Sequence, residues 1–172
     1  MILTLWVVLT EDILQLFTYI CLIDMLKYIF LLLFCCASGF SQSIHDFAKN
    51  GDLQAIQALD IEDQAVFNLQ NENGYSPLML AAYYNKTDII LYLLKNKANP
   101  DIKEKDYGQT ALMISVIKQH DQIVEALLDG GASPNLPSNG GSMPLLEAAF
   151  KENPKILEML LKHGAEVDAT NS

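Results

Sequence analysis

The chain has 172 residues, which suits one small domain with an additional segment, and it carries a net charge of −10. All 11 basic residues are lysines, and arginine is absent from the sequence. Because phosphate contacts need clustered lysines and arginines, and base readout relies largely on arginine, this composition argues against nucleic acid as a partner. An acidic surface keeps a domain soluble and would also suit a basic protein partner.

Residues 1–41 are predicted to form a targeting segment because most of their first 36 side chains are apolar. Within it, residues 25–41 read MLKYIFLLLFCCASGFS. A short basic start, an apolar run and a group of small residues follow one another there, as in a secretory signal peptide. Cleavage after Gly39 or Ser41 would export the protein to a periplasm or to the cell exterior.

The same segment allows a second interpretation, in which residues 13–36 stay uncleaved as a membrane anchor. About 20 apolar residues are enough to span a bilayer. Such a span would place Asp24 and Lys27 near mid-membrane, at a cost of roughly 2.5–3.5 kcal/mol each. We therefore favour a cleaved signal that starts at Met25, with membrane contact through residues 1–36 as the alternative.

Three similar blocks follow, at residues 71–104, 105–137 and 138–170. The hexapeptide SPLMLA of the first block recurs as TALMIS and then MPLLEA, at steps of 34 and 33 residues. A Leu-Leu pair followed by alanine recurs at the same steps. A tight turn precedes each hexapeptide, and the predicted turn dipeptides are Asn73-Gly74, Tyr107-Gly108 and Asn139-Gly140.

Each block contains the pattern of two short helices. A Ser or Thr hydroxyl suits the cap of the first helix, and proline suits its first turn. Apolar pairs spaced three to four residues apart predict an apolar stripe along the second helix. The residues predicted to be buried there are Ile89, Ile90, Leu93 and Leu94; Ile123, Val124, Leu127 and Leu128; and Ile156, Leu157, Leu160 and Leu161.

These blocks resemble the ankyrin repeat, which has about 33 residues, a T-P-L-H-x-A motif and a later Leu-Leu and Gly-Ala. The resemblance covers about residues 43–170. It implies an all-α solenoid of about four helix-turn-helix repeats joined by β-turn or hairpin connections. Residues 42–70 look like a degenerate N-terminal capping repeat, because Ile44–Leu59 aligns with both helices but lacks the Pro-Leu opening.

Two residues depart from the repeat pattern. Lys97 stands where the other blocks have Gly131 and Gly164, so a left-handed backbone there would be strained by about 1 kcal/mol. Met143 replaces the capping Ser or Thr, a loss of about 1 kcal/mol unless Ser142 substitutes for it. We therefore expect the last repeat to fray.

No catalytic or metal-binding motif was found in the sequence, so we expect no enzyme activity, no cofactor and no metal. The three cysteines all precede residue 37. In the ankyrin family, histidines commonly stand where His120 and His163 do, and structural capping is the favoured interpretation of both. The acidic stretch Asp101–Asp106 is interpreted as a solvated loop. A hydrolase or metal enzyme is the least favoured function.

Partners of ankyrin repeats commonly dock in a concave groove formed by the turn tips and the first helices. The positions carried over to this sequence are Glu72, Asn73, Tyr75, Tyr83 and Tyr84; Asp106, Tyr107, Gln109, Ile117 and Lys118; and Asn139, Gly140, Ser142, Phe150 and Lys151. Aromatic side chains recur among them, as in interface hot spots. The alternative is that Tyr83, Tyr84 and Phe150 partly pack between repeats.

The resemblance thus implies a non-enzymatic protein–protein binding module. With a cleaved signal, we expect it to act as an exported adaptor or as an inhibitor that covers a partner's active surface. With an uncleaved segment, it would be a membrane-anchored ankyrin scaffold.

Overall fold

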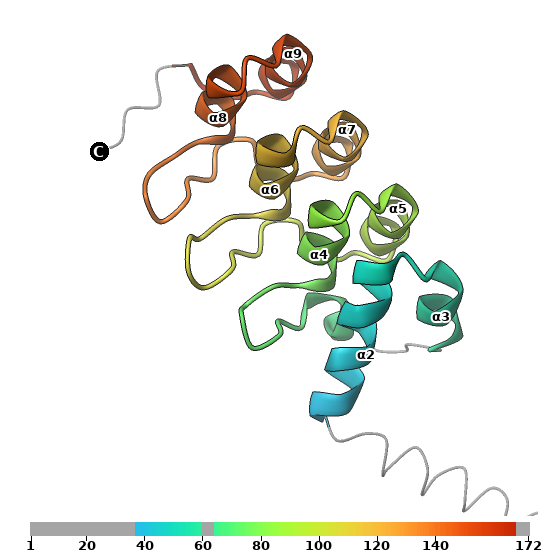
Figure 1. Ribbon diagram of the computed structural model, residues 1–172. Helices are drawn as coiled ribbons and strands as arrows, with labels where there is room; N and C mark the ends of the chain where they lie inside the picture. Colours follow the sequence, from blue (N-terminus) through green and yellow to red (C-terminus); the bar gives the residue numbers. More distant parts are fainter. Residues whose placement is uncertain (1–36, 60–63, 168–172) are drawn as a thin grey trace, which may run out of the picture. The chain divides into compact units, whose positions relative to one another are not determined.

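The computed structural model describes residues 37–59 and 64–167 (Figure 1). Its helices are α2 (Ala37–Asn50), α3 (Leu53–Ala58), the 3-10 helix η1 (Gln64–Asn68), α4 (Pro77–Tyr83), α5 (Thr87–Lys95), α6 (Ala111–Lys118), α7 (Asp121–Asp129), α8 (Pro144–Phe150) and α9 (Pro154–Lys162). Within these ranges there is no β-strand, and no helix is both long and apolar enough to cross a membrane. The predicted signal peptide and anchor lie mostly outside the described residues.

The helices form two layers of a solenoid. The first helices α4, α6 and α8 lie side by side, and the second helices α5, α7 and α9 form the second layer, to their right in the view (Figure 1). A loop projects to the same side before each of α4, α6 and α8 (Figure 1). The predicted all-α ankyrin-type solenoid is confirmed, with α2 and α3 as the helix pair that precedes these three repeats.

The first helix of the N-terminal pair starts earlier than the predicted repeat boundary at residue 42. The backbone of α2 is helical from Ala37. Both bonds predicted for signal cleavage, after Gly39 and after Ser41, therefore lie within this helix. The cleavage itself stays a prediction.

Side-chain caps explain where two of the first helices begin. Ser76 and Thr110 have extended backbones, and each hydroxyl accepts the backbone N–H three residues later, at 3.3 and 3.2 Å. These bonds satisfy amide groups that have no partner within the helix. Pro77 occupies the first turn of α4, where its missing N–H costs nothing.

The third of these helices, α8, begins without such a cap. Met143 makes no side-chain hydrogen bond at the cap position. Ser142 does not substitute for it, because its Oγ donates to Glu147 Oε1 at 2.6 Å. The predicted loss of the cap is therefore confirmed.

Left-handed residues end the helices. Lys97 follows α5 with a φ of 62°, in the place of Gly131 and Gly164, which both have a φ of 88°. The predicted left-handed backbone at Lys97 is thus confirmed, and the cost of about 1 kcal/mol stays a prediction.

One predicted turn was misplaced by one residue. The positive φ of the third loop lies at Gly141 rather than at Gly140. Its N–H donates to the Ser138 carbonyl at 3.0 Å, just as Gly74 donates to Asn71 in the first loop at 2.9 Å. Gly140 and Gly141 are consecutive, so by sequence either could have adopted the positive φ. The hydrogen bond between the first and fourth residues of the turn, Ser138 and Gly141, places it at Gly141.

The second helices bury most of the predicted stripe. Buried are Ile89, Ile90, Leu93, Ile123, Val124, Leu127, Leu128, Ile156 and Leu160. Leu94 and Leu157 are half-buried and pack against this core. The prediction for Leu161 was wrong, because its side chain is 41% exposed whereas the equivalent Leu128 is 4% exposed. The next repeat covers Leu128, and no further repeat follows Leu161 in the described residues.

Candidate protein-binding surface

A cluster of aromatic and basic side chains lies at the ends of three neighbouring first helices. The rings of Tyr83 and Tyr84, from the end of α4, are edge to face with centroids 5.0 Å apart. Lys118 Nζ, from α6, is 4.0 Å from the Tyr83 centroid, and Lys49 Nζ, from α2, is 5.5 Å from the Tyr84 centroid. We call these four residues the tyrosine–lysine cluster.

The structure thus brings three predicted site residues together and adds one. Tyr83, Tyr84 and Lys118 were predicted, whereas Lys49 was missed. The alignment of the N-terminal repeat, which pairs Lys49 with Tyr83, could have found it. Each tyrosine is 42% exposed, so the rings pack partly on neighbours and partly face solvent.

The last repeat extends the same face with fewer contacts. Phe150 is 80% exposed, so it does not pack between repeats. Lys151 follows Phe150 in the chain, and Ile117 is the equivalent of Phe150 in the preceding repeat. Both side chains are half-buried. Aromatic or branched apolar side chains therefore continue along the face from α4 to α8.

A buried carboxylate organises the loop between α5 and α6. Glu104 is only 2% exposed. Its two oxygens accept three backbone N–H groups at 2.7, 2.8 and 2.9 Å, those of Asp106, Tyr107 and Gln109. The interpretation of Asp101–Asp106 as a solvated loop was therefore wrong at Glu104, because these amides need an acceptor that water does not supply inside the turn.

Hydrogen bonds between successive loops hold their tips in a row. Lys105 Nζ donates to the Glu72 carbonyl at 3.0 Å. The backbone N–H of Asn139 donates to the Tyr107 carbonyl at 2.7 Å, and its side chain donates to the Asp106 carbonyl at 3.2 Å. The predicted tip residues are exposed, and Tyr107 most clearly, at 67%. They are Glu72, Asn73, Asp106, Tyr107, Asn139 and Gly140.

The remaining predicted residues lie where each loop meets its helix. Tyr75, Gln109 and Ser142 occupy equivalent positions and are half-buried. Tyr75 packs against the core, and this burial, with the nearby carboxylates of Glu104 and Asp106, raises the pKa of its hydroxyl. Tyr75 is therefore mainly a packing residue, and it offers a partner less surface than Tyr107.

The two histidines of the later repeats are structural: His163 caps the C-terminal end of its own helix α9, whereas the His120 side chain makes no cap bond to α7. His120 Nδ1 lies 3.0 Å from the Ala82 carbonyl of the preceding repeat. His163 lies 2.8 Å from the Met159 carbonyl and 3.2 Å from an Asp129 oxygen of the preceding repeat. Both rings link neighbouring repeats.

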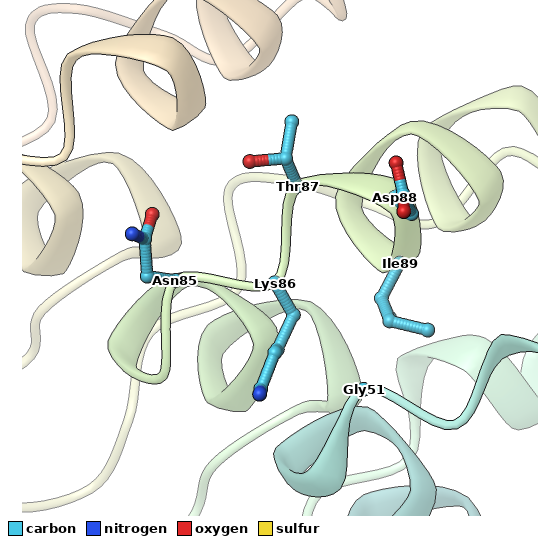
Figure 2. Close-up of a pocket in the computed structure, with 6 residues that line it drawn as sticks. All are labelled: Gly51, Asn85, Lys86, Thr87, Asp88 and Ile89. Carbon is cyan, nitrogen blue, oxygen red and sulfur yellow. The ribbon is translucent and has the colours of Figure 1, made fainter.

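A shallow cavity of about 260 Å³ lies at the turns that directly follow Lys49–Asn50 and Tyr83–Tyr84 in the chain (Figure 2). Its lining residues are Gly51, Asn85, Lys86, Thr87, Asp88 and Ile89. Within residues 37–59 and 64–167, no group of three or more His, Cys, Asp and Glu side chains could hold a metal ion. The aromatic face is thus the more substantial candidate for recognition.

The stacked helix pairs, with loop tips and first helices along one exposed face, define a helical repeat protein built for binding. The family model for ankyrin repeats, in three copies, matches residues 44–138 and 107–171. The chain belongs to the ankyrin-repeat family. Ankyrin repeats are protein–protein interaction modules and are generally not enzymes.

Individual relatives are similar over most of this chain. An ankyrin repeat protein of Rickettsia felis is 32% identical over 127 residues, 72% of this chain and 41% of that protein. The nuclear factor NF-kappa-B p105 subunit of Gallus gallus is 32% identical over 132 residues, 74% of this chain and 13% of that protein. The match therefore spans less than half the length of each relative.

Proposed function

We propose that this protein is a non-enzymatic module that holds another protein against its first helices and loop tips, and that it acts after export as an adaptor or inhibitor. The observation that carries the proposal is the tyrosine–lysine cluster. Tyr83 and Tyr84 are each 42% exposed.

The cluster is suited to recognition for two physical reasons. Tyrosine provides a large contact area with few rotatable bonds, so binding it costs little conformational entropy. Contacts with Lys49 and Lys118 fix the rings before any partner arrives, and such preorganisation favours affinity. Tyr107 adds an exposed aromatic side chain at the loop tips, which are the other part of the proposed surface.

Changing Tyr83, Tyr84 and Tyr107 together to Ala is expected to weaken partner binding about 100-fold or more, because hot-spot aromatics carry much of an interface's energy. The partner would be isolated from the producing cells with the full chain as bait, and its affinity measured by titration calorimetry. Leu91→Ala, on α5 with 53% of its side chain exposed, is the matched control. Equal affinities for the triple variant and the unmodified protein, with helical content unchanged in both, would contradict the proposal.

Export is a separate part of the proposal and rests on residues 25–41 of the sequence. Determining the N-terminus of the protein in its producing cells by mass spectrometry tests it. We expect the mature chain to start at Phe40 or Gln42. An intact Met1 or Met25 would instead favour the membrane-anchored scaffold.

A further inference from the structure

The charge along the first helices differs from that of the whole chain. Two equivalent positions lie at the C-terminal end of the first helix in each of the four helix pairs. Their residues are Lys49 and Asn50, Tyr83 and Tyr84, Ile117 and Lys118, and Phe150 and Lys151. These eight positions hold three lysines and no carboxylate, although the chain has 21 acidic and 11 basic residues. We call this set the inner-helix row.

The three lysines of this row have no carboxylate partner among the described residues. The lysine ion pair seen in residues 37–59 and 64–167 joins Lys155 to Asp121 at 3.3 Å, on the second-helix layer. Lys49 and Lys118 instead lie beside the rings of the tyrosine pair. An ammonium group beside an aromatic ring still has N–H groups that can donate to an acceptor.

Acidic residues lie near the row, but none of them forms an ion pair within 4 Å with a lysine of the row in the described residues. Asp46 and Glu147 are one turn earlier on α2 and α8, and Glu152 follows Lys151 in the next turn. Glu147 Oε1 accepts a hydrogen bond from Ser142 Oγ at 2.6 Å. Exposed carboxylates also stand on the loop tips, at Glu72 and Asp106, away from the helix ends.

Resting on the proposed function, we infer that the inner-helix row binds an acidic segment of the partner protein. Carboxylates of that segment pair with Lys49, Lys118 and Lys151, and an apolar side chain between them packs on Tyr83 and Tyr84. The net charge of the chain favours a basic partner, but the local arrangement of lysines and tyrosines favours an acidic one on this face. The row itself carries only positive charge, and exposed charges beyond about 8–10 Å are largely screened at physiological salt, so the distant part of the negative net charge has little effect there.

The register of the repeats also predicts the spacing of the acidic residues. Packed helices lie about 8–10 Å apart, and an extended chain advances about 3.3 Å per residue, so one repeat corresponds to about three residues. Lys49 and Lys118 are two repeats apart, and Lys151 is one repeat further. The bound segment should therefore carry acids about six and then about three residues apart.

A random 12-residue peptide display library, selected on the full chain, tests this inference. We expect enriched peptides to carry more Asp and Glu than Lys and Arg. Their affinity for the protein should be lower by about tenfold or more in ~300 mM salt than in ~50 mM salt. Reversing the charges in Lys49→Glu/Lys118→Glu/Lys151→Glu should abolish binding of these peptides and select basic ones instead. The matched control Lys95→Glu/Lys97→Glu/Lys162→Glu, at exposed positions elsewhere, changes the net charge equally and should still select acidic peptides.

The Tyr83→Ala/Tyr84→Ala variant separates the two proposals. If the enriched peptides are neutral or basic but are lost in this variant, the surface binds proteins and the acidic-segment inference is wrong. The acidic-segment inference is also wrong if the charge reversal at Lys49, Lys118 and Lys151 and the control reversal select the same kind of peptide. If nothing is enriched, or if binding ignores the tyrosine variant, the proposed function fails and the inference fails with it.

Discussion

We expect the Glu104→Ala variant to unfold with a free energy about 3 kcal/mol below that of the unmodified protein. The carboxylate is buried and accepts three backbone N–H groups of its own loop. Hydrogen bonds to a charged acceptor contribute roughly 1.5–3 kcal/mol each, and water entering the emptied site recovers part of the loss. Urea unfolding followed by circular dichroism measures the difference.

Two further variants identify the cause of this loss. Glu104→Gln keeps one acceptor oxygen and should lose about half as much stability, because the NH2 that replaces the other oxygen cannot accept the remaining N–H. Glu158→Ala, at an exposed position of α9, should change stability by less than about 0.5 kcal/mol. If Glu104→Ala were no more damaging than Glu158→Ala, the hydrogen bonds around Glu104 would not stabilise the loop. Because this loop carries Asp106 and Tyr107, a disordered loop in Glu104→Ala should also weaken partner binding.

Gly108→Ala is expected to cost about 3 kcal/mol and to disturb the row of loop tips. Gly108 has a φ of 65°, where a side chain costs about 1–2 kcal/mol. A Cβ there would also lie 2.8 Å from the backbone nitrogen of Asn139 and still closer to its side chain. Asn139 donates to the carbonyls of Tyr107 and Asp106, so moving it breaks the bonds that join the second and third loops.

Gly131→Ala is the matched control for this prediction. Gly131 also has a positive φ, of 88°, but a Cβ there meets no atom within 4 Å. This variant should therefore show only the backbone strain, about 1 kcal/mol, in the same urea experiment. Equal losses in the two variants would mean that contact between the loops adds nothing to stability.

Most of the repeat architecture could be predicted because it depends on local patterns. The cap hydroxyls of Ser76 and Thr110, and the apolar pairs of the second helices, act within a few residues of themselves. The one error in the buried stripe, at Leu161, concerns the last repeat, because burial there depends on a neighbour rather than on the helix itself.

The candidate site was predicted less completely. The register of the repeats placed Tyr83, Tyr84 and Lys118 on one face without showing that they touch. Lys49 was missed because its repeat is degenerate, and Tyr75 turned out to be half-buried. Side-chain contacts between repeats depend on rotamers and on how closely neighbouring helices approach, and neither follows from spacing along the chain.

The sequence by itself determined the period, the helix pairs, the family resemblance and the left-handed backbone at Lys97, because each follows from local patterns and from their recurrence along the chain. The tertiary structure alone decided three features: the buried role of Glu104, the turn at Gly141 and the tyrosine–lysine cluster. Each of these depends on contacts made in three dimensions, either across a folded loop or between helices about 34 residues apart in the chain. A charge is buried or exposed according to those contacts, whatever the pattern in which it occurs.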